Sequence, residues 1–255
     1  MTGDTPRLIG FENYYKLVSD PEIWDSTLKG LGFSVSCVVI QLLLGLGIAL
    51  TLKDYKGKVG SIMTTLVVIP LFVPPITIGT LFYSLVKAAF SPVPYYLAQI
   101  GIIYAFGANP IHTLITVIFM DTWHWVGLVV IILLAALSGV PAEYLEAAKI
   151  DMASRWQTFR RVILPNIKFP MMVVAIIRFI DCFKMYDEIW VLTGWMPITK
   201  FLSILTVRTA IGEANMGYGS AIGLFFLYIV IIVTALFMVL MSLDERRKTK
   251  KAAQR

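Results

Sequence analysis

The segment Pro141–Pro165 reads PAEYLEAAKIDMASRWQTFRRVILP and is the only long polar interval between strongly apolar segments of this chain. Its first proline suits the start of a helix, where the missing N–H is not needed. Glu143 and Glu146 would then lie near the positive end of the helix dipole. The segment divides at Asp151-Met152-Ala153, so it predicts two short helices joined by a turn.

Ser154 and Gln157 have the spacing of a capping box, which predicts that the second helix starts at Ser154 and stops before Pro165. Small side chains near the turn would let another backbone come close; they are Ala147, Ala148 and Ala153. Capping-box matches also occur by chance. An ordinary amphipathic loop between membrane helices is therefore the alternative interpretation.

The composition predicts a polytopic membrane protein. The hydrophobic share is 58% in 255 residues and the mean hydropathy is +0.78, above the roughly half apolar composition of soluble domains. The formal net charge is +6. The sequence has no phosphate-binding loop of the G-x-x-x-x-G-K-[ST] kind, so we expect no ATP hydrolysis by this chain. Cys37 and Cys182 fall in apolar segments and indicate neither a disulfide nor a metal site.

Five stretches are long enough to cross a hydrocarbon core of roughly 30 Å. They are residues 30–52, 59–86, 111–137, 170–192 and 221–243. Pro70, Pro74 and Pro75 predict a kink or interruption in the second. The expected fold is an all-α polytopic transmembrane helical bundle. Its parts are a polar segment over 1–25 without signal-peptide features, a transmembrane domain over 26–243, and a basic, disordered tail over 244–255. Residues 87–110 and 193–220 are predicted connections.

The positions of Lys and Arg predict the orientation. The rich set lies in two connections and the tail: Lys53, Lys56, Lys58, Lys149, Arg155, Arg160, Arg161, Lys168, Arg246, Arg247, Lys248, Lys250, Lys251 and Arg255. The sparse set lies in the N-terminal segment and in the two connections on the opposite side of the membrane: Arg7, Lys16, Lys87, Lys200 and Arg208. Because positive loops stay in the cytoplasm, we expect the C-terminus and 141–165 inside and the N-terminus outside. The tail would touch anionic lipid.

The segment 141–165 resembles the EAA loop of ATP-binding-cassette (ABC) importer permeases of the carbohydrate-uptake type. The matching residues, in order, are Glu146-Ala147-Ala148, Asp151, Ala153, Phe159 and Leu164-Pro165. The match departs at Met152, where the family usually has Gly. If that Gly supplies a positive φ, Met152 would be strained there. From Phe11-Glu12-Asn13-Tyr14 onward, the chain is similar to the first permease subunit of maltose and glycerol-3-phosphate importers, which usually has one more helix before that point.

This resemblance implies a type I, MetI-like permease that moves a sugar, oligosaccharide or related polyol across a bacterial or archaeal inner membrane by alternating access. The implied partners are a second homologous permease in a heterodimer, an ATPase dimer, an external solute-binding protein and membrane lipid, with no nucleic acid and no cofactor. ATP hydrolysis would occur on the partner chains, so this chain would not be an enzyme. The implied ATPase-coupling contacts are Glu146, Ala147, Ala148, Asp151, Met152 and Ala153.

Charged residues in the fourth predicted span are costly in a bilayer, at least about 2.5 kcal/mol each. The spacing lets Arg178 pair with Asp181 and Asp181 with Lys184, which is the structural interpretation. The functional interpretation is a path for a hydroxyl-rich solute, lined by Asp181, Phe183, Tyr186 and Trp190. Beyond it, Trp195-Met196 stands where the permease family usually has Gly-Gly, which would alter an external loop.

Asp121 and His124 are three residues apart on a predicted helix, beside Trp123 and Trp125. We favour a satisfied polar pair near the membrane interface, because Trp is common at headgroup level. The alternative is an ion-coupled secondary transporter that uses Asp121, His124 and Asp181. A membrane scaffold without transport is a third interpretation, in which these charges could be replaced in pairs without loss of function.

Overall fold

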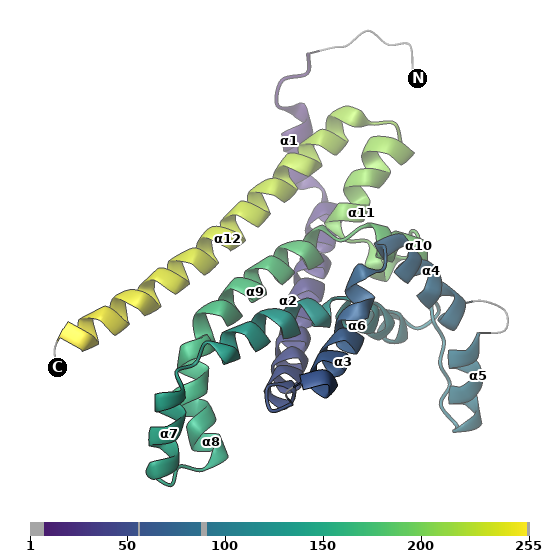
Figure 1. Cartoon of the computed structure of the whole chain (residues 1–255). Helices are drawn as coiled ribbons and strands as arrows, with labels where there is room; N and C mark the ends of the chain where they lie inside the picture. Colours follow the sequence, from purple (N-terminus) through teal and green to yellow (C-terminus); the bar gives the residue numbers. More distant parts are fainter. Residues whose placement is uncertain (1–7, 56, 88–90, 254–255) are drawn as a thin grey trace. The chain divides into compact units, whose positions relative to one another are not determined.

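The computed structural model describes residues 8–55, 57–87 and 91–253, and every regular element within these ranges is helical (Figure 1). Four helices are long and apolar enough to cross a membrane, and a fifth span results if one bent helix pair is counted. The four are Pro21–Leu52, Pro110–Ser138, Arg155–Lys184 and Met216–Val239. The all-α bundle and the expected number of spans agree with this architecture.

Most of the described elements are α-helices. In chain order they are α1 (Glu12–Ser19), α2 (Pro21–Leu52), α3 (Gly57–Val68), α4 (Pro75–Val86), α5 (Pro92–Gln99), α6 (Pro110–Ser138), α7 (Ala142–Ile150), α8 (Arg155–Thr158), α9 (Leu164–Lys184), α10 (Asp187–Thr193), α11 (Leu202–Val207) and α12 (Met216–Ala253). Short 3₁₀-helices are η1 (Ile69–Phe72) and η3 (Pro197–Thr199), and π-helical turns are η2 (Phe159–Ile163) and η4 (Arg208–Gly212).

The chain divides into two compact units. The first unit comprises Met1–Ser36, Pro75–Met120 and Ile180–Ala235, and the second comprises Cys37–Pro74, Asp121–Phe179 and Leu236–Arg255. Each unit draws on segments that are distant in the sequence, because long helices contribute different parts of their length to different units.

The first unit has a core built by α1, α2, α11 and α12. Its buried members are Leu17, Ile23, Leu202, Leu205, Tyr218, Ala221 and Ile222. Phe183 stacks on Phe226 with ring centroids 4.9 Å apart, and Phe33 stacks on Phe201 at 4.8 Å. In the same unit α4 and α10 lie against each other (Figure 1). Their close approach occurs at Gly79, where an added Cβ would lie 2.8 Å from the carbonyl oxygen of Glu188.

The second unit has a core of aliphatic side chains from α2, α6, η2 and α9. Its buried members are Ala49, Val129, Leu133, Leu137, Ile163, Ile167 and Val174. Helices approach closely at two glycines: a Cβ at Gly45 would lie 2.6 Å from Val129, and one at Gly127 would lie 2.8 Å from the carbonyl oxygen of Val67. Small residues at such contacts allow the dispersion packing on which helix association in lipid depends.

The second predicted span breaks after η1, where the prolines predict an interruption. The carbonyl of Val73, at the break, accepts a hydrogen bond from Nε2 of His124, 3.1 Å away. A side chain from α6 thus satisfies a backbone group that a continuous helix would have satisfied itself.

Three expected boundaries are wrong. The helix that begins at Ser154 does not stop before Pro165 but runs to Lys184, because the π-helical turn η2 widens the backbone where the proline ring and missing N–H must be accommodated. The fourth span accordingly covers 155–184 rather than 170–192, and α10 is a separate helix.

The tail over 244–255 is not irregular, because α12 continues to Ala253. Its Lys, Arg, Glu and Ala are good helix formers, which explains the continuation. Arg7, Lys56 and Arg255 lie outside the described residues, as do the tail's basic side chains.

Candidate functional site: the α7–α8 hairpin and the polar residues of the spans

The turn between α7 and α8 is a Schellman motif. Asp151 is the C-cap of α7; the N–H of Met152 donates to the carbonyl of Lys149 (3.1 Å), and the N–H of Ala153 donates to that of Ala148 (3.0 Å). These bonds satisfy the last carbonyls of the helix. Met152 has φ +54°, the left-handed conformation that the motif requires. Methionine therefore occupies a position that favours glycine, at a cost of about 1 kcal/mol, and the turn geometry is retained.

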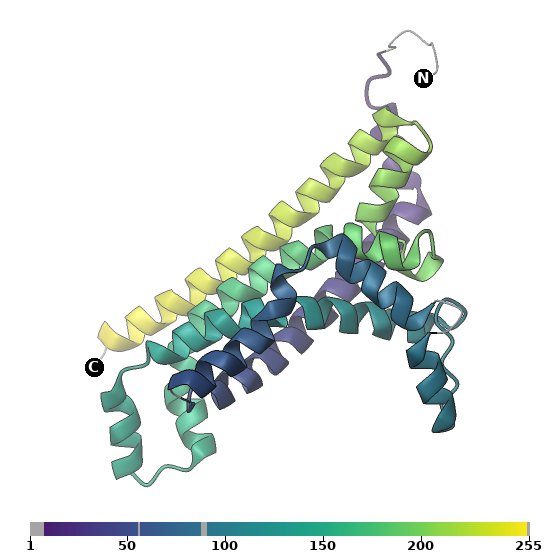
Figure 2. The same ribbon diagram turned by 45° about the vertical axis from the view of Figure 1, so that its right-hand side comes forward.

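The start of α8 is fixed by a complete capping box, as predicted. The N–H of Gln157 donates to Oγ of Ser154 (3.3 Å), and the N–H of Ser154 donates to Oε1 of Gln157 (2.8 Å). Two backbone donors at the helix start are thus satisfied. Figures 1 and 2 both show α7 and α8 side by side, so that these short helices form a hairpin.

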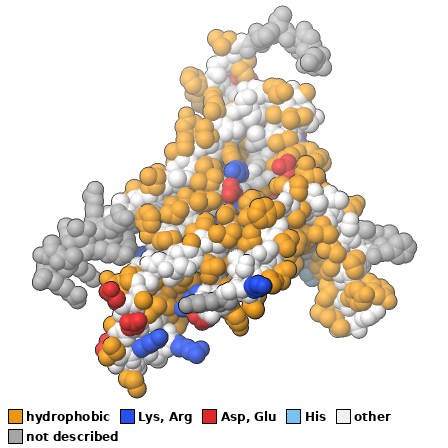
Figure 3. Space-filling view, viewed as in Figure 1, with side chains coloured by type: hydrophobic (Ala, Val, Ile, Leu, Met, Phe, Trp, Pro, Cys, Tyr) orange, Lys and Arg blue, Asp and Glu red, His pale blue; other side chains and the backbone are white. Residues whose placement is uncertain are grey.

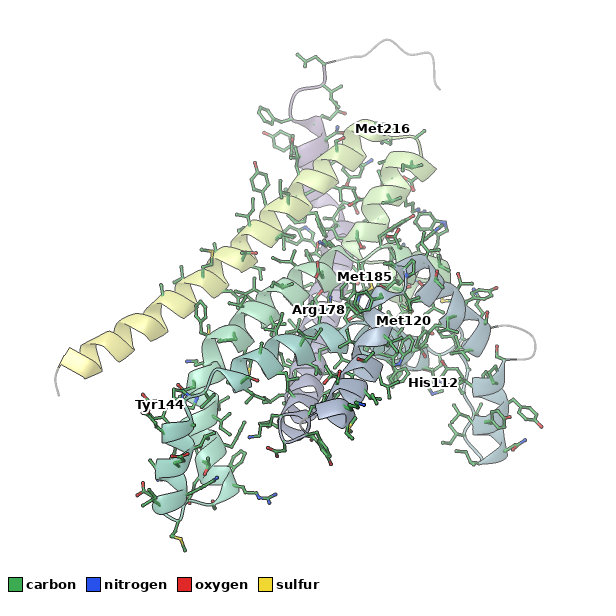
Figure 4. The ribbon with its side chains drawn as sticks, in the orientation of Figure 1. His112, Met120, Tyr144, Arg178, Met185 and Met216 are labelled. Atoms are coloured by element: carbon green, nitrogen blue, oxygen red, sulfur yellow. The ribbon has the colours of Figure 1, made fainter. Side chains whose placement is uncertain are left out.

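The hairpin holds a groove of about 490 Å³ on one side. Its lining residues are Tyr144, Ala147, Ala148, Asp151, Ala153, Gln157, Thr158, Arg161, Val162 and Asn166. Tyr144 is labelled on α7 in Figure 4. Ala147 and Asp151 are exposed, whereas Ala148 is buried and so belongs to the floor. Four of the six predicted coupling residues therefore line this one groove: Ala147, Ala148, Asp151 and Ala153.

Glu146 and Met152, the other two predicted coupling residues, are exposed beside the groove. Figure 3 shows acidic and basic side chains gathered over α7 and α8 on a surface that is otherwise mostly apolar. The exposed charged residues of this region are Glu143, Glu146, Lys149, Asp151, Arg155, Arg160 and Arg161. Exposed apolar side chains accompany them at the tip: Ile150, Met152 and Trp156.

A buried polar triad joins α2, α6 and α9 within the second unit. Nη2 of Arg178 lies 3.0 Å from Oδ1 of Asp121, and Nε of Arg178 donates to Oε1 of Gln41 at 2.8 Å. Nε2 of Gln41 donates to Oδ2 of Asp121 at 2.7 Å. The guanidinium also lies 4.6 Å from the centroid of the Trp125 ring. Arg178, labelled on α9 in Figure 4, is 1% exposed. Each buried charge thus has an opposite charge and hydrogen-bond partners.

These contacts revise two expectations. Arg178 bonds to an aspartate on a different helix, so spacing within α9 does not alone decide its partner. Asp121 and His124 are buried among helices, and they bond to different partners, Arg178 and the Val73 carbonyl, respectively. The expected pairing of Asp181 with Lys184 is present, at 2.9 Å.

The four predicted path residues lie in the first unit but differ in exposure. Phe183 is buried against Phe226 and so contributes to packing, whereas Asp181, Tyr186 and Trp190 are partly exposed. Tyr186 and Trp190 have nearly parallel rings, 6.1 Å apart. Burial, and to a lesser degree the charge of Asp187, raises the pKa of Tyr186. Its hydroxyl therefore remains a hydrogen-bond donor at neutral pH.

Comparison with known proteins identifies the family. Residues 41–250 match the family described as binding-protein-dependent transport system inner membrane component. The chain belongs to this family. It is therefore a transport subunit of a membrane-embedded importer and not an enzyme.

Two relatives of this permease carry a sugar in their names. The trehalose/maltose transport system permease protein MalF of Thermococcus litoralis is 30% identical over 234 residues, which cover 90% of this chain and 78% of that protein. The trehalose transport system permease protein SugA of Mycobacterium tuberculosis is 30% identical over 242 residues, which cover 93% and 76%.

Solved structures share the fold of the permease. A chain of a bacterial ABC transporter involved in the import of the acidic polysaccharide alginate superposes with a TM-score of 0.82 at 21% identity, covering 92% of this chain and 84% of that one. A second structure of the alginate transporter, in complex with a periplasmic protein that holds an alginate pentasaccharide, gives a TM-score of 0.80 at 22% identity. Family membership removes the ion-coupled secondary transporter from consideration.

One member of the buried triad, Gln41, was missed by the sequence analysis. It lies in α2 within a stretch that has no charged residue, and its side chain bonds to both charges of the triad. Its presence as an amide in an apolar span was the available signal, because buried amides require partners.

Proposed function

We propose that this permease moves a sugar or a short oligosaccharide across the cell membrane by alternating access, driven by a separate ATPase. The names of the relatives support the substrate class: trehalose and maltose in one, trehalose in another, and starch degradation products in a third. A hydroxyl-rich solute also suits the partly exposed Asp181, Tyr186 and Trp190, since rings cover apolar sugar faces and a carboxylate accepts hydroxyl protons.

The α7–α8 hairpin is the observation that carries the coupling mechanism. Three small residues line its groove, Ala147, Ala148 and Ala153, which allows a partner backbone to come close, and its rim holds exposed charges of both signs, Asp151 and Arg161. A protein surface with complementary charges would be oriented by such a rim. We assign the groove and the adjoining Glu146 and Met152 to contact with the ATPase.

A movement of the hairpin would be transmitted directly to the membrane span that contains α9. Residues 155–184 form one helical run of 30 residues, through α8, η2 and α9, without an intervening loop. Arg178 lies in this run and is tied to α6 and α2 by the triad. A displacement of α8 by ATPase closure would therefore move α9 and, through the triad, the two helices bonded to it.

The full assembly in this proposal contains a second homologous permease in a heterodimer, two ATPase subunits and an external binding protein. In this proposal the hairpin and the C-terminus face the cytoplasm, because they belong to the segments richest in Lys and Arg and such segments stay in the cytoplasm. Residues 1–25 and the segment after α10 face outward, where a binding protein would deliver the sugar.

The test places a large side chain in the groove. Ala147→Trp fills the groove from an exposed position, whereas a change at buried Ala148 would disturb the hairpin itself. Ala142→Trp is the matched control, since Ala142 is an exposed alanine of α7 outside the lining residues. In proteoliposomes with the complete transporter, we expect Ala147→Trp to lower ATP-driven uptake about tenfold, the effect of an overpacked contact.

The readouts are uptake of labelled trehalose and maltose, ATPase recruitment to the membrane complex, and yield of the permease. Ala142→Trp should leave all three unchanged. Normal uptake by Ala147→Trp at normal complex yield would contradict the coupling assignment. Uptake of neither sugar, nor of related oligosaccharides, by the wild-type transporter would contradict the substrate class.

A further inference from the structure

A cluster of Trp195, Arg208 and Glu213 stands apart from the α7–α8 hairpin and the triad, in the first unit. Cζ of Arg208 lies 5.5 Å from the centroid of the Trp195 ring, and Nε of Arg208 lies 3.0 Å from Oε1 of Glu213. Trp195 is 43% exposed even with these neighbours. The indole surface, a guanidinium and a carboxylate are therefore accessible together.

Trp195 also ends a row of aromatic rings. Tyr186 lies 6.1 Å from Trp190 in a nearly parallel arrangement, and Trp190 lies 4.2 Å from Trp195 at an angle of 65°. Tyr186 and Trp190 are both partly exposed. The row thus begins beside α9, near the partly exposed Asp181, and ends at the charged pair of Arg208 and Glu213.

The backbone around the cluster is unusual in three places. Gly194, directly before Trp195, has φ +58°; Arg208 begins the π-helical turn η4; and Ala214, directly after Glu213, has φ +52°. A π-helical turn and a non-glycine residue at positive φ, such as Ala214, cost energy and recur at functional sites, whereas glycine adopts a positive φ without strain. Gly212 packs beneath the cluster, since a Cβ there would lie 3.9 Å from Arg208 and from Trp195.

The charges of the cluster balance. Besides Glu213, Arg208 faces Glu22 at 3.8 Å, and Glu22 accepts from Lys200 at 2.6 Å. Two cations and two carboxylates therefore neutralise one another. An acidic saccharide would gain little from Arg208 in this setting, whereas a neutral sugar could bond to donors and acceptors alike and stack on the indole.

We propose that Trp195, Arg208 and Glu213 form a contact site for a neutral saccharide at the end of the aromatic row, where the sugar meets the permease before it reaches Trp190 and Tyr186. This inference rests on the proposed function and adds a specific entry site to it. In this site Trp195 supplies the surface for the sugar ring, and Arg208 and Glu213 bond to its hydroxyls.

The test uses the complete transporter in proteoliposomes with labelled trehalose and maltose at saturating sugar-loaded binding protein. Trp195→Ala should lower the uptake rate about three- to tenfold, the range expected for loss of one aromatic contact. Trp195→Phe should restore most of the rate, because it keeps a ring. Tyr228→Ala is the control, since Tyr228 is a 60% exposed aromatic residue of α12 in the same unit and lies outside the row.

Affinity of the binding protein for the transporter, and thermal stability of each variant, are measured in parallel and should not change. Wild-type uptake rates for Trp195→Ala would overturn the site while leaving the proposed function standing. A loss of binding-protein affinity with normal uptake at saturation would reassign the cluster to protein docking. Unlabelled oligosaccharides are also added as competitors of the labelled sugar. If a uronic-acid oligosaccharide lowers uptake more than a neutral one does, the site does not take a neutral saccharide. Wild-type transport of neither sugar would reject both proposals.

Discussion

Arg178 is a charged residue in a membrane helix, where burial of a charge costs free energy. Its guanidinium, the Asp121 carboxylate and the Gln41 amide close a triangle of hydrogen bonds, and the Trp125 ring faces the cation. Taking either charge alone into a buried position is expensive, but an opposite charge and further hydrogen bonds offset part of that cost. The triad therefore favours one register of three helices over others.

We predict that Arg178→Met destabilises the permease by about 3–5 kcal/mol, because it leaves the Asp121 charge buried without its cation. The double variant Arg178→Met with Asp121→Leu should recover most of the loss, since both charges are then gone. Thermal unfolding of the purified complex measures both effects.

Lys184→Met is the matched control for this prediction. It removes a cation from the same helix, but the side chain of Lys184 is 58% exposed where it pairs with Asp181, against 1% for Arg178. An exposed pair is worth about 0–1 kcal/mol. Equal losses from Lys184→Met and Arg178→Met would refute the role of burial.

At the level of residues, the sequence identifies the costly charges and the Asp181–Lys184 pair, but not the partners of Arg178 and Asp121. Spacing along one helix suggests Asp181 for Arg178 and His124 for Asp121, because only contacts within a helix can be read from spacing. The observed partners of Arg178 come from α2 and α6, 137 and 57 residues away. The capping box at Ser154 is different: both members are local, and the structure confirms the prediction.

Among the elements, α4 and α10 show how closely two helices of the first unit can approach. A Cβ on Gly79 would lie 2.8 Å from the Glu188 carbonyl oxygen and 2.9 Å from Cβ of Val191. A backbone carbonyl cannot move aside without shifting α10. Glycine is therefore required at this position by the space that the neighbouring helix leaves.

We predict that Gly79→Ala destabilises the permease by about 1–3 kcal/mol through overpacking. Gly32→Ala, in α2 of the same unit, is the control, because a Cβ there meets nothing within 4 Å. That change should be neutral or stabilising by up to about 1 kcal/mol, since alanine favours the helix. Comparable destabilisation by both variants, in thermal unfolding, would show that the α4–α10 contact is not decisive.

The sequence predicts a helical span where the length of an apolar run is the only criterion. It predicts less well whether a proline ends a helix. The first and last spans follow from uncharged runs, and the prolines at 70, 74 and 75 break the second one as expected. Pro165 instead lies inside a helix, because the π-helical turn before it accommodates the ring. No local pattern distinguishes the two outcomes, since the second depends on how η2 packs.

At the scale of the whole molecule, the two compact units separate the Lys and Arg residues that predict orientation. Every described member of the rich set lies in the second unit, with Lys53, Lys149, Arg160 and Lys168 among them, whereas the described members of the sparse set lie in the first. Because positive connections stay in the cytoplasm, we predict that the connections that hold the rich set face the cytoplasm.

This orientation predicts the result of cysteine labelling in intact cells. Cys37 and Cys182 are buried and can be replaced by Ala. Asp54→Cys then places a thiol at an exposed turn of the second unit, and Gln99→Cys places one at the exposed end of α5 in the first. A membrane-impermeant maleimide should label the thiol at 99 in intact cells and the thiol at 54 only after permeabilisation.

Asp54 lies outside the α7–α8 hairpin, so an ATPase bound to the hairpin would not shield a thiol at position 54. Labelling at 54 in intact cells would place the connection after α2 outside. The α7–α8 connection, two spans further along the chain, would then lie outside as well, where no cytoplasmic ATPase could reach it, and the coupling proposal would fail with the orientation.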